Sequence, residues 1–107
     1  MQAEILYIAD CPNRLPARRQ VDRLLAESGI SCLVDEVEVA DTQAARRLGF
    51  VGSPTIRIDG RDVSPPVSPA PAALACRTYE VDGRFSGTPS DDVIRAAIAR
   101  SAASGTQ

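Results

Sequence analysis

The chain has no histidine, no lysine and no tryptophan among its 107 residues. Without histidine it lacks the commonest general base and a common metal ligand, so Ser-His and Cys-His catalysis within the chain are excluded. Aromatic residues make up only 4% of the sequence, so stacking of a ligand on aromatic rings is not expected. A formal net charge of -2 carries no electrostatic signature of a nucleic-acid partner.

Long hydrophobic runs and export signals are also missing. The N-terminus begins with a strand-like run that carries Glu4, not with a basic stretch followed by a long apolar one. No apolar run is long enough to cross a membrane. We therefore expect a soluble, cytoplasmic protein with no membrane partner. A length of 107 residues, 44% of them hydrophobic, suits one domain. We assign residues 1–100 to that domain and residues 101–107 to a flexible tail.

The chain has only three cysteines, Cys11, Cys32 and Cys76, which is an odd number. In a chain without an export signal, an odd count does not favour a structural disulfide framework, and free thiols are the expectation. Cys32 lies in an apolar stretch between Ser31 and Leu33, which suits a small buried core residue. The other two cysteines are the candidates for chemistry.

Cys11 follows an apolar run at residues 3–9, which predicts a first strand buried on both faces. A thiol between a strand and a helix lies near free backbone N–H groups, which favour thiolate, whereas the neighbouring Asp10 opposes it. A C-x-x-C redox motif would place its second cysteine where this chain has Arg14. Any dithiol reaction must therefore find its second thiol elsewhere.

The first helix is predicted over residues 17–28, where apolar residues recur at helical spacing until Gly29. Pro16 is tolerated only in a first turn, because it has no N–H to donate. A helix that began at Pro12 would lose about 3 kcal/mol at this proline. Asn13 as N-cap avoids that loss and leaves the thiol just before the helix.

Arg14, Arg18 and Arg19 gather near the start of this helix. Guanidinium groups bind carboxylates in a bidentate manner, so these residues could attract an anionic thiol ligand such as glutathione. A solvated helix face explains the same residues without any ligand. Both interpretations stay open at the level of sequence.

Strands and short helices alternate through the rest of the chain. The expected elements are a strand at residues 30–39, a helix at 43–48 capped by Asp41 or Thr42, a strand at 55–58, a fourth strand at 77–81 and a helix capped by Ser90 that ends at Arg100. Asp59-Gly60 and Asp82-Gly83 are hairpin-turn pairs. Residues 64–75 are rich in proline and predict a surface loop.

This order of strand, helix, strand, helix, hairpin and helix is that of the thioredoxin fold. It predicts an α/β protein of βαβαββα succession with a four-stranded mixed sheet flanked by helices. Pro54 stands directly before a predicted strand, and a cis Ser53-Pro54 bond would hold the Ser53 backbone beside the start of the first helix. Only about 5–6% of such bonds are cis, so this expectation comes from the fold and not from the dipeptide.

Several stretches carry a resemblance to a known family. They are Cys-Pro-Asn at 11–13, the block from Leu48 to Val63 with its Gly-Ser-Pro-Thr-Ile-Arg-Ile-Asp-Gly-Arg-Asp-Val core, Ala-Cys-Arg-Thr-Tyr at 75–79, and Gly-Thr-Pro-Ser at 87–90. In these stretches the chain resembles small bacterial thioredoxin-like proteins, some of which are labelled alkylmercury-lyase-like. The resemblance implies the fold more strongly than the reaction, because a fold does not determine an activity.

In that family the thiol before the first helix attacks a disulfide, and the residue before the cis-proline pairs with the substrate backbone. The resemblance therefore implies that Cys11 is a nucleophile or a soft-metal ligand. It implies a docking edge at Ser53, Pro54 and Thr55. No cofactor is expected.

Cys76 is the candidate partner for Cys11, if the proline-rich loop folds back over the end of the first strand. At the start of a fourth strand it would lie at the far end of the sheet, roughly 10–15 Å away at about 3.3 Å per residue. A disulfide needs the two Cα atoms within about 7 Å. The path of the loop therefore decides whether the two thiols can react with each other.

Three functions fit these observations. The first is thiol-disulfide exchange through Cys11, with a protein disulfide or a small thiol as partner and with Cys76 or glutathione resolving the mixed disulfide. The second is binding of a soft metal ion such as Hg²⁺ by both thiols, with Asp10 as proton donor if a carbon-metal bond is cleaved. The third is a thioredoxin-like interaction scaffold without thiol chemistry.

Overall fold

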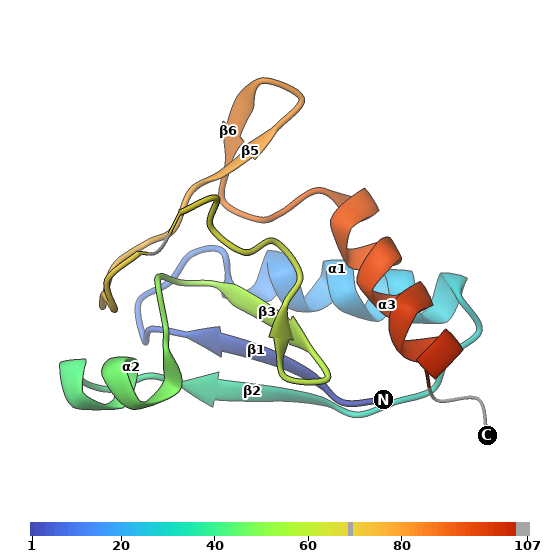
Figure 1. Ribbon diagram of the computed structural model, residues 1–107, viewed down its shortest axis with the longest axis horizontal. Coiled ribbons are helices and arrows are strands. Elements are labelled where there is room, and N and C mark those ends of the chain that lie inside the picture. Colours follow the sequence, from blue (N-terminus) through green and yellow to red (C-terminus); the bar gives the residue numbers. More distant parts are fainter. Residues whose placement is uncertain (69, 105–107) are drawn as a thin grey trace.

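A four-stranded mixed sheet forms the centre of the computed structural model, which describes residues 1–68 and 70–104 (Figure 1). Its strands are β1 (Ala3–Tyr7), β2 (Val34–Glu38), β3 (Thr55–Ile58) and β4 (Arg61–Asp62), in the spatial order β2-β1-β3-β4. β1 pairs in parallel with β2 and antiparallel with β3, and β3 pairs antiparallel with β4. The expected mixed sheet of four strands is therefore confirmed.

The helices in the described part of the chain are α1 (Arg14–Glu27), α2 (Thr42–Leu48) and α3 (Asp91–Ser104). α1 and α3 pack together against β1 and β3. Neighbouring residues of β1 point to opposite faces of the sheet, so Ile5 joins the core under α1 and α3, while Leu6 joins a smaller core with Ala45 of α2 and Phe50. The predicted burial of the first strand on both faces is confirmed. No helix in the described ranges has the length and hydrophobicity needed to span a bilayer.

Local signals set the ends of the helices. α1 begins at Arg14, ahead of the predicted residues 17–28, so Pro16 falls in its first turn; Asn13 occupies the N-cap position, but its side chain makes no capping hydrogen bond. The Asp41 carboxylate caps α2 by accepting a hydrogen bond from the Ala44 N–H at 2.7 Å. α2 ends at Gly49, whose φ of 64° lies in the left-handed region that glycine adopts without strain.

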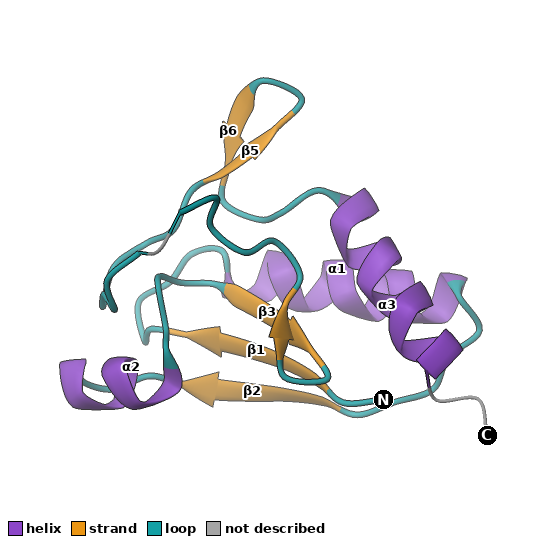
Figure 2. Ribbon diagram, viewed as in Figure 1, coloured by secondary structure: helices purple, strands orange, loops and turns teal. Residues whose placement is uncertain are grey.

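A strand forms within residues 77–81 as expected, but the prediction that it is the fourth strand of the main sheet is wrong. β4, directly after the Asp59-Gly60 turn, takes the fourth position in the sheet, because a hairpin partner across a tight turn is the nearest available strand. β5 (Tyr79–Val81) pairs instead with β6 (Arg84–Ser86) in a separate two-stranded hairpin. This hairpin stands off from the main sheet (Figure 1), and the loop that leads to it carries neither helix nor strand in its described residues (Figure 2).

Other element ends also differ from expectation. β2 begins at Val34 and not at residue 30, so Cys32 lies in the loop before it and packs against the core only partly buried. α3 continues to Ser104, beyond the predicted end at Arg100, so the expected flexible tail does not begin at residue 101. Ser101 is buried and donates a hydrogen bond to Asp59, which explains the extension. Pro69 and residues 105–107 lie outside the described residues.

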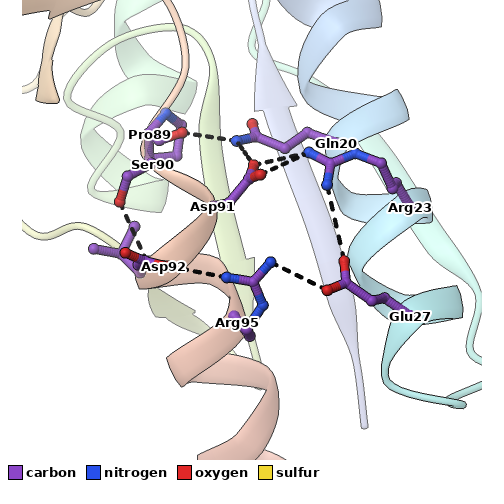
Figure 3. A network of polar contacts seen from close by, with 9 residues as sticks. Gln20, Arg23, Glu27, Pro89, Ser90, Asp91, Asp92 and Arg95 are labelled. Carbon is purple, nitrogen blue, oxygen red and sulfur yellow. Dashed lines mark hydrogen bonds and ion pairs between the residues drawn. The ribbon is translucent and has the colours of Figure 1, made fainter.

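A polar network joins α1 to the start of α3 (Figure 3). Gln20 Nε2 donates to the Pro89 carbonyl at 2.8 Å and to Asp91 Oδ1 at 2.9 Å, and the Arg23 guanidinium donates to both Asp91 oxygens. The hydrogen bond from Gln20, together with Arg23, lowers the pKa of the Asp91 carboxyl. Arg95 extends the network by bridging Glu27 and Asp92.

We expect Asp91→Asn to reduce the free energy of unfolding by about 0.5–1 kcal/mol near neutral pH, since the pair is partly exposed to solvent. Folding lowers the pKa of Asp91. The contribution of its carboxylate to the free energy of unfolding is therefore complete above the unfolded-state pKa of about 3.9, and it is lost as the pH falls through the folded-state pKa. Urea denaturation should therefore give a difference that shrinks below about pH 4.

The matched control is Asp92→Asn, in the same helical turn but 92% exposed and bound to Arg95 of its own helix. Both variants lose the favourable interaction of an acidic residue with the helix N-terminus. An equal loss of stability in the two variants would contradict the role given to the contacts between Asp91 and α1.

Candidate thiol site

Cys11 lies in the turn between β1 and α1, as predicted. Its N–H donates to the Ile8 carbonyl at 3.1 Å, and its own carbonyl accepts from the Arg14 N–H at 3.4 Å. The residue is only 8% exposed. The first candidate thiol is therefore held in a tight turn and is largely covered by the protein.

Ser53 and Pro54 are joined by a cis peptide bond, as expected from the fold. Ser53 is fully buried, and its hydroxyl accepts a hydrogen bond from the Ile8 N–H at 3.1 Å. Ile8 thus binds Ser53 through its N–H and Cys11 through its carbonyl. The turn before β3 is consequently fixed beside the turn that carries the buried thiol.

Cys76 forms an isolated parallel bridge with Ser53. The Ser53 N–H donates to the Ala75 carbonyl at 2.8 Å, and the Arg77 N–H donates to the Ser53 carbonyl at 2.8 Å. Of the two placements that the sequence left open for Cys76, the one at the far end of the sheet is therefore not adopted. The proline-rich loop returns to the end of the sheet that carries Cys11, because the segment around Cys76 belongs to no strand of the main sheet.

The residues of the implied docking edge are all engaged within the chain. Both backbone polar groups of Ser53 pair with segment 75–77. The Pro54 carbonyl accepts from the Tyr79 hydroxyl at 2.5 Å, and the Thr55 hydroxyl donates to the Gly52 carbonyl at 2.7 Å. A substrate that paired with the backbone of Ser53 would first have to displace segment 75–77.

Arg77 anchors the segment that carries Cys76. Its side chain, 9% exposed, donates to Asp62 at 2.8 Å, to Thr55 Oγ1 at 3.3 Å and to the Ser64 carbonyl. Sequence reasoning did not single out this residue. The sequence shows only that an arginine stands inside the Ala-Cys-Arg-Thr-Tyr stretch. Nothing near it in the chain indicates that Asp62 is its partner.

Tyr79 holds the other side of the same segment. The Arg77 guanidinium lies over its ring, 4.4 Å from the centroid. Burial raises the pKa of the Tyr79 hydroxyl, and the arginine offsets part of this effect. The phenol therefore stays protonated at neutral pH and can donate its hydrogen bond to the Pro54 carbonyl. This bond ties the β5 strand to the cis-proline turn.

The arginines at the start of α1 are mostly used in contacts with β2. Arg14 and Arg18 bind the two oxygens of Glu36 at 2.7 and 3.0 Å. The hydrogen bond to Glu36 is the main cause of a raised pKa of Arg14. Arg19 is exposed. Two of the three guanidinium groups that could have attracted an anionic thiol ligand therefore have a structural partner.

All three cysteines are free thiols, with Cys76 exposed and Cys32 partly buried. Within residues 1–68 and 70–104, no group of three or more acidic or thiol side chains could hold a metal ion. The site is thus defined by one buried and one exposed thiol at the same end of the mixed sheet. Comparison with models of known families, with curated proteins and with solved structures finds no match for this chain.

The contact between Gly52 and Arg77 predicts a specific loss of stability. Gly52 has a φ of 138°, and a Cβ added there would lie 2.7 Å from the Arg77 Cβ. We expect Gly52→Ala to reduce the free energy of unfolding by at least about 2 kcal/mol, because backbone strain and a steric clash act together. Denaturant titration measures this loss.

Gly83→Ala is the matched control, since Gly83 also has a positive φ, of 77°, but no atom within 4 Å of an added Cβ. It should lose only about 1 kcal/mol, from the backbone alone. Equal losses in the two alanine variants would show that the close approach of Arg77 to Gly52 has no energetic role.

Proposed function

We propose that this protein carries out thiol-disulfide exchange with Cys11 and Cys76 as its pair of reacting thiols. The observation that supports the proposal is the bridge between Ser53 and Cys76. Ser53 binds Ile8, and Ile8 binds Cys11, so a short series of hydrogen bonds joins the two cysteine segments. Cys32 lies in a different loop, against the core beneath α1 and α3.

A thioredoxin-like architecture is part of the same proposal. Three features support it: the sheet order β2-β1-β3-β4, a cysteine between β1 and α1, and a cis-proline directly before β3. β4 and β6 are additions to the succession that the sequence predicts.

The exposure of the two thiols suggests different roles. Cys76 is exposed, whereas Cys11 is 8% exposed, so an incoming disulfide meets Cys76 first. The Cys76 thiolate attacks one sulfur of the substrate disulfide, a new S–S bond forms, and the other substrate sulfur leaves as a thiolate and takes a proton from water. This order assigns the first attack to Cys76 and not to Cys11.

Cys11 then resolves the mixed disulfide. Its thiolate attacks the Cys76 sulfur and displaces the remaining substrate sulfur as a thiol. The substrate disulfide is thereby reduced by two electrons, and the protein is oxidised to a Cys11-Cys76 disulfide. A small thiol regenerates both protein thiols in two further exchanges and is itself oxidised to its disulfide.

Single-cysteine variants separate these roles. With an excess of a small disulfide such as hydroxyethyl disulfide, we expect the unsubstituted protein to form an internal disulfide, seen by mass spectrometry as the loss of two hydrogens. Cys11→Ser should accumulate the mixed disulfide on Cys76, because no second thiol resolves it. Cys76→Ser should form no internal disulfide.

Cys32→Ser is the matched control and should behave as the unsubstituted protein. An internal disulfide that includes Cys32 would contradict the proposed pair. A mixed disulfide that accumulates on Cys11 while Cys76 stays reduced would contradict the proposed order of attack. Protein that stays fully reduced in excess disulfide would instead favour a scaffold without thiol chemistry.

Binding of a soft metal ion is the second candidate function, because both thiols lie at one end of the sheet. Two thiolates suit linear coordination of Hg²⁺ as bound cargo. A titration with Hg²⁺ should give one equivalent bound tightly by the unsubstituted protein and clearly weaker binding by Cys76→Ser. Equal binding by the two proteins would exclude a two-thiol site.

A further inference from the structure

The β5-β6 hairpin and the proline-rich loop enclose a groove with Cys76 in its lining. The groove has a volume of about 580 Å³, which falls within the range of sites that bind ligands. Pro66 and Val67 line it from the loop, and Phe85 lines it from the hairpin. The hairpin stands away from the main sheet (Figure 1).

Two apolar side chains in the lining of this groove, one from the proline-rich loop and one from the hairpin, are almost fully exposed. Val67 has a relative exposure of 107% and Phe85 of 81%. The exposed Cys76 thus shares the groove with two apolar side chains that are left open to solvent. Aromatic side chains of this kind are frequent energetic anchors of protein interfaces.

The groove also carries a single unpaired charge. Arg77 lines it, but its guanidinium is committed to Asp62, Thr55 and Ser64. Glu80 has no ion-pair partner among the described residues, and it lies directly opposite Phe85 across the hairpin. Directly opposed residues share one face of a hairpin, so the carboxylate and the aromatic ring lie side by side.

We propose that this groove binds an extended polypeptide whose disulfide-bonded cysteine is flanked by one apolar and one basic residue. The inference rests on the proposed exchange at Cys76. The apolar residue packs on Phe85 and Val67, and the basic residue pairs with Glu80. Glutathione disulfide is a poor fit as substrate, because its carboxylates find no free cation in the groove and are repelled by Glu80.

A competition between activated disulfides tests this inference. The probes are two short peptides and glutathione, each with its single cysteine joined to thionitrobenzoate. One peptide has the sequence Ala-Leu-Cys-Arg-Ala, and the second has glutamate in place of the arginine. The second-order rate of thionitrobenzoate release is measured with the Cys11→Ser protein, so that the mixed disulfide on Cys76 persists and mass spectrometry assigns the site.

We expect the basic peptide to react about fivefold faster than the acidic peptide, as a single exposed ion pair allows. Glu80→Gln should remove this difference. Phe85→Ala should slow both peptides about fivefold and leave glutathione unchanged, because only the peptides use the apolar wall. Leu33→Ala, which removes an 87% exposed apolar side chain outside the groove, should change none of these rates.

The possible failures are distinguishable. If Cys76 exchanges readily but Glu80→Gln and Phe85→Ala leave every rate ratio unchanged, the groove inference is overturned and the proposed function stands. If Cys76 reacts with no probe, the proposed function itself fails. If gel filtration detects a dimer that Phe85→Ala dissociates, a second copy of this chain occupies the groove and the inference is also overturned.

Discussion

The buried Ser53 is the residue on which the arrangement of the site depends. Its hydroxyl accepts from Ile8, its N–H donates to Ala75, and its carbonyl accepts from Arg77. Buried polar groups are almost always satisfied, since an unpaired one loses its hydration without compensation. These bonds therefore hold three segments, the exit of β1, the end of the proline-rich loop and the entry to β3, in one place.

Arg77 and Tyr79 make that arrangement rigid on the side of the exposed thiol. The pair of Arg77 and Asp62 is largely shielded from solvent, so removal of either partner would leave a charge with little hydration. Tyr79 adds a hydrogen bond to the carbonyl of Pro54. The segment that carries Cys76 is consequently fixed on both sides, although the thiol itself stays exposed.

The contrast between the two thiols gives the proposed chemistry its direction. A covered thiol next to the core and an exposed thiol in a groove cannot serve the same step of an exchange reaction. The exposed thiol shares its groove with an aromatic ring and a carboxylate, which lie on one face of the β5-β6 hairpin. The proposed order of attack and the proposed substrate preference thus rest on burial and charge, not on a C-x-x-C motif, which this chain lacks.

The sequence by itself determined the features that depend on neighbouring residues. Pro16 falls in the first turn of α1, Asp41 caps α2, and Asp59-Gly60 turns the chain into β4. Caps, turns and periodic burial depend on residues a few positions apart, so they can be predicted from the sequence. Only the tertiary structure decided that β4 completes the sheet, that Arg77 pairs with Asp62, and that Cys76 reaches Ser53. The contacts of Arg77 and Cys76 join segments that are distant in the sequence, and the path of the proline-rich loop between them, which no local periodicity constrains, determines which partners meet.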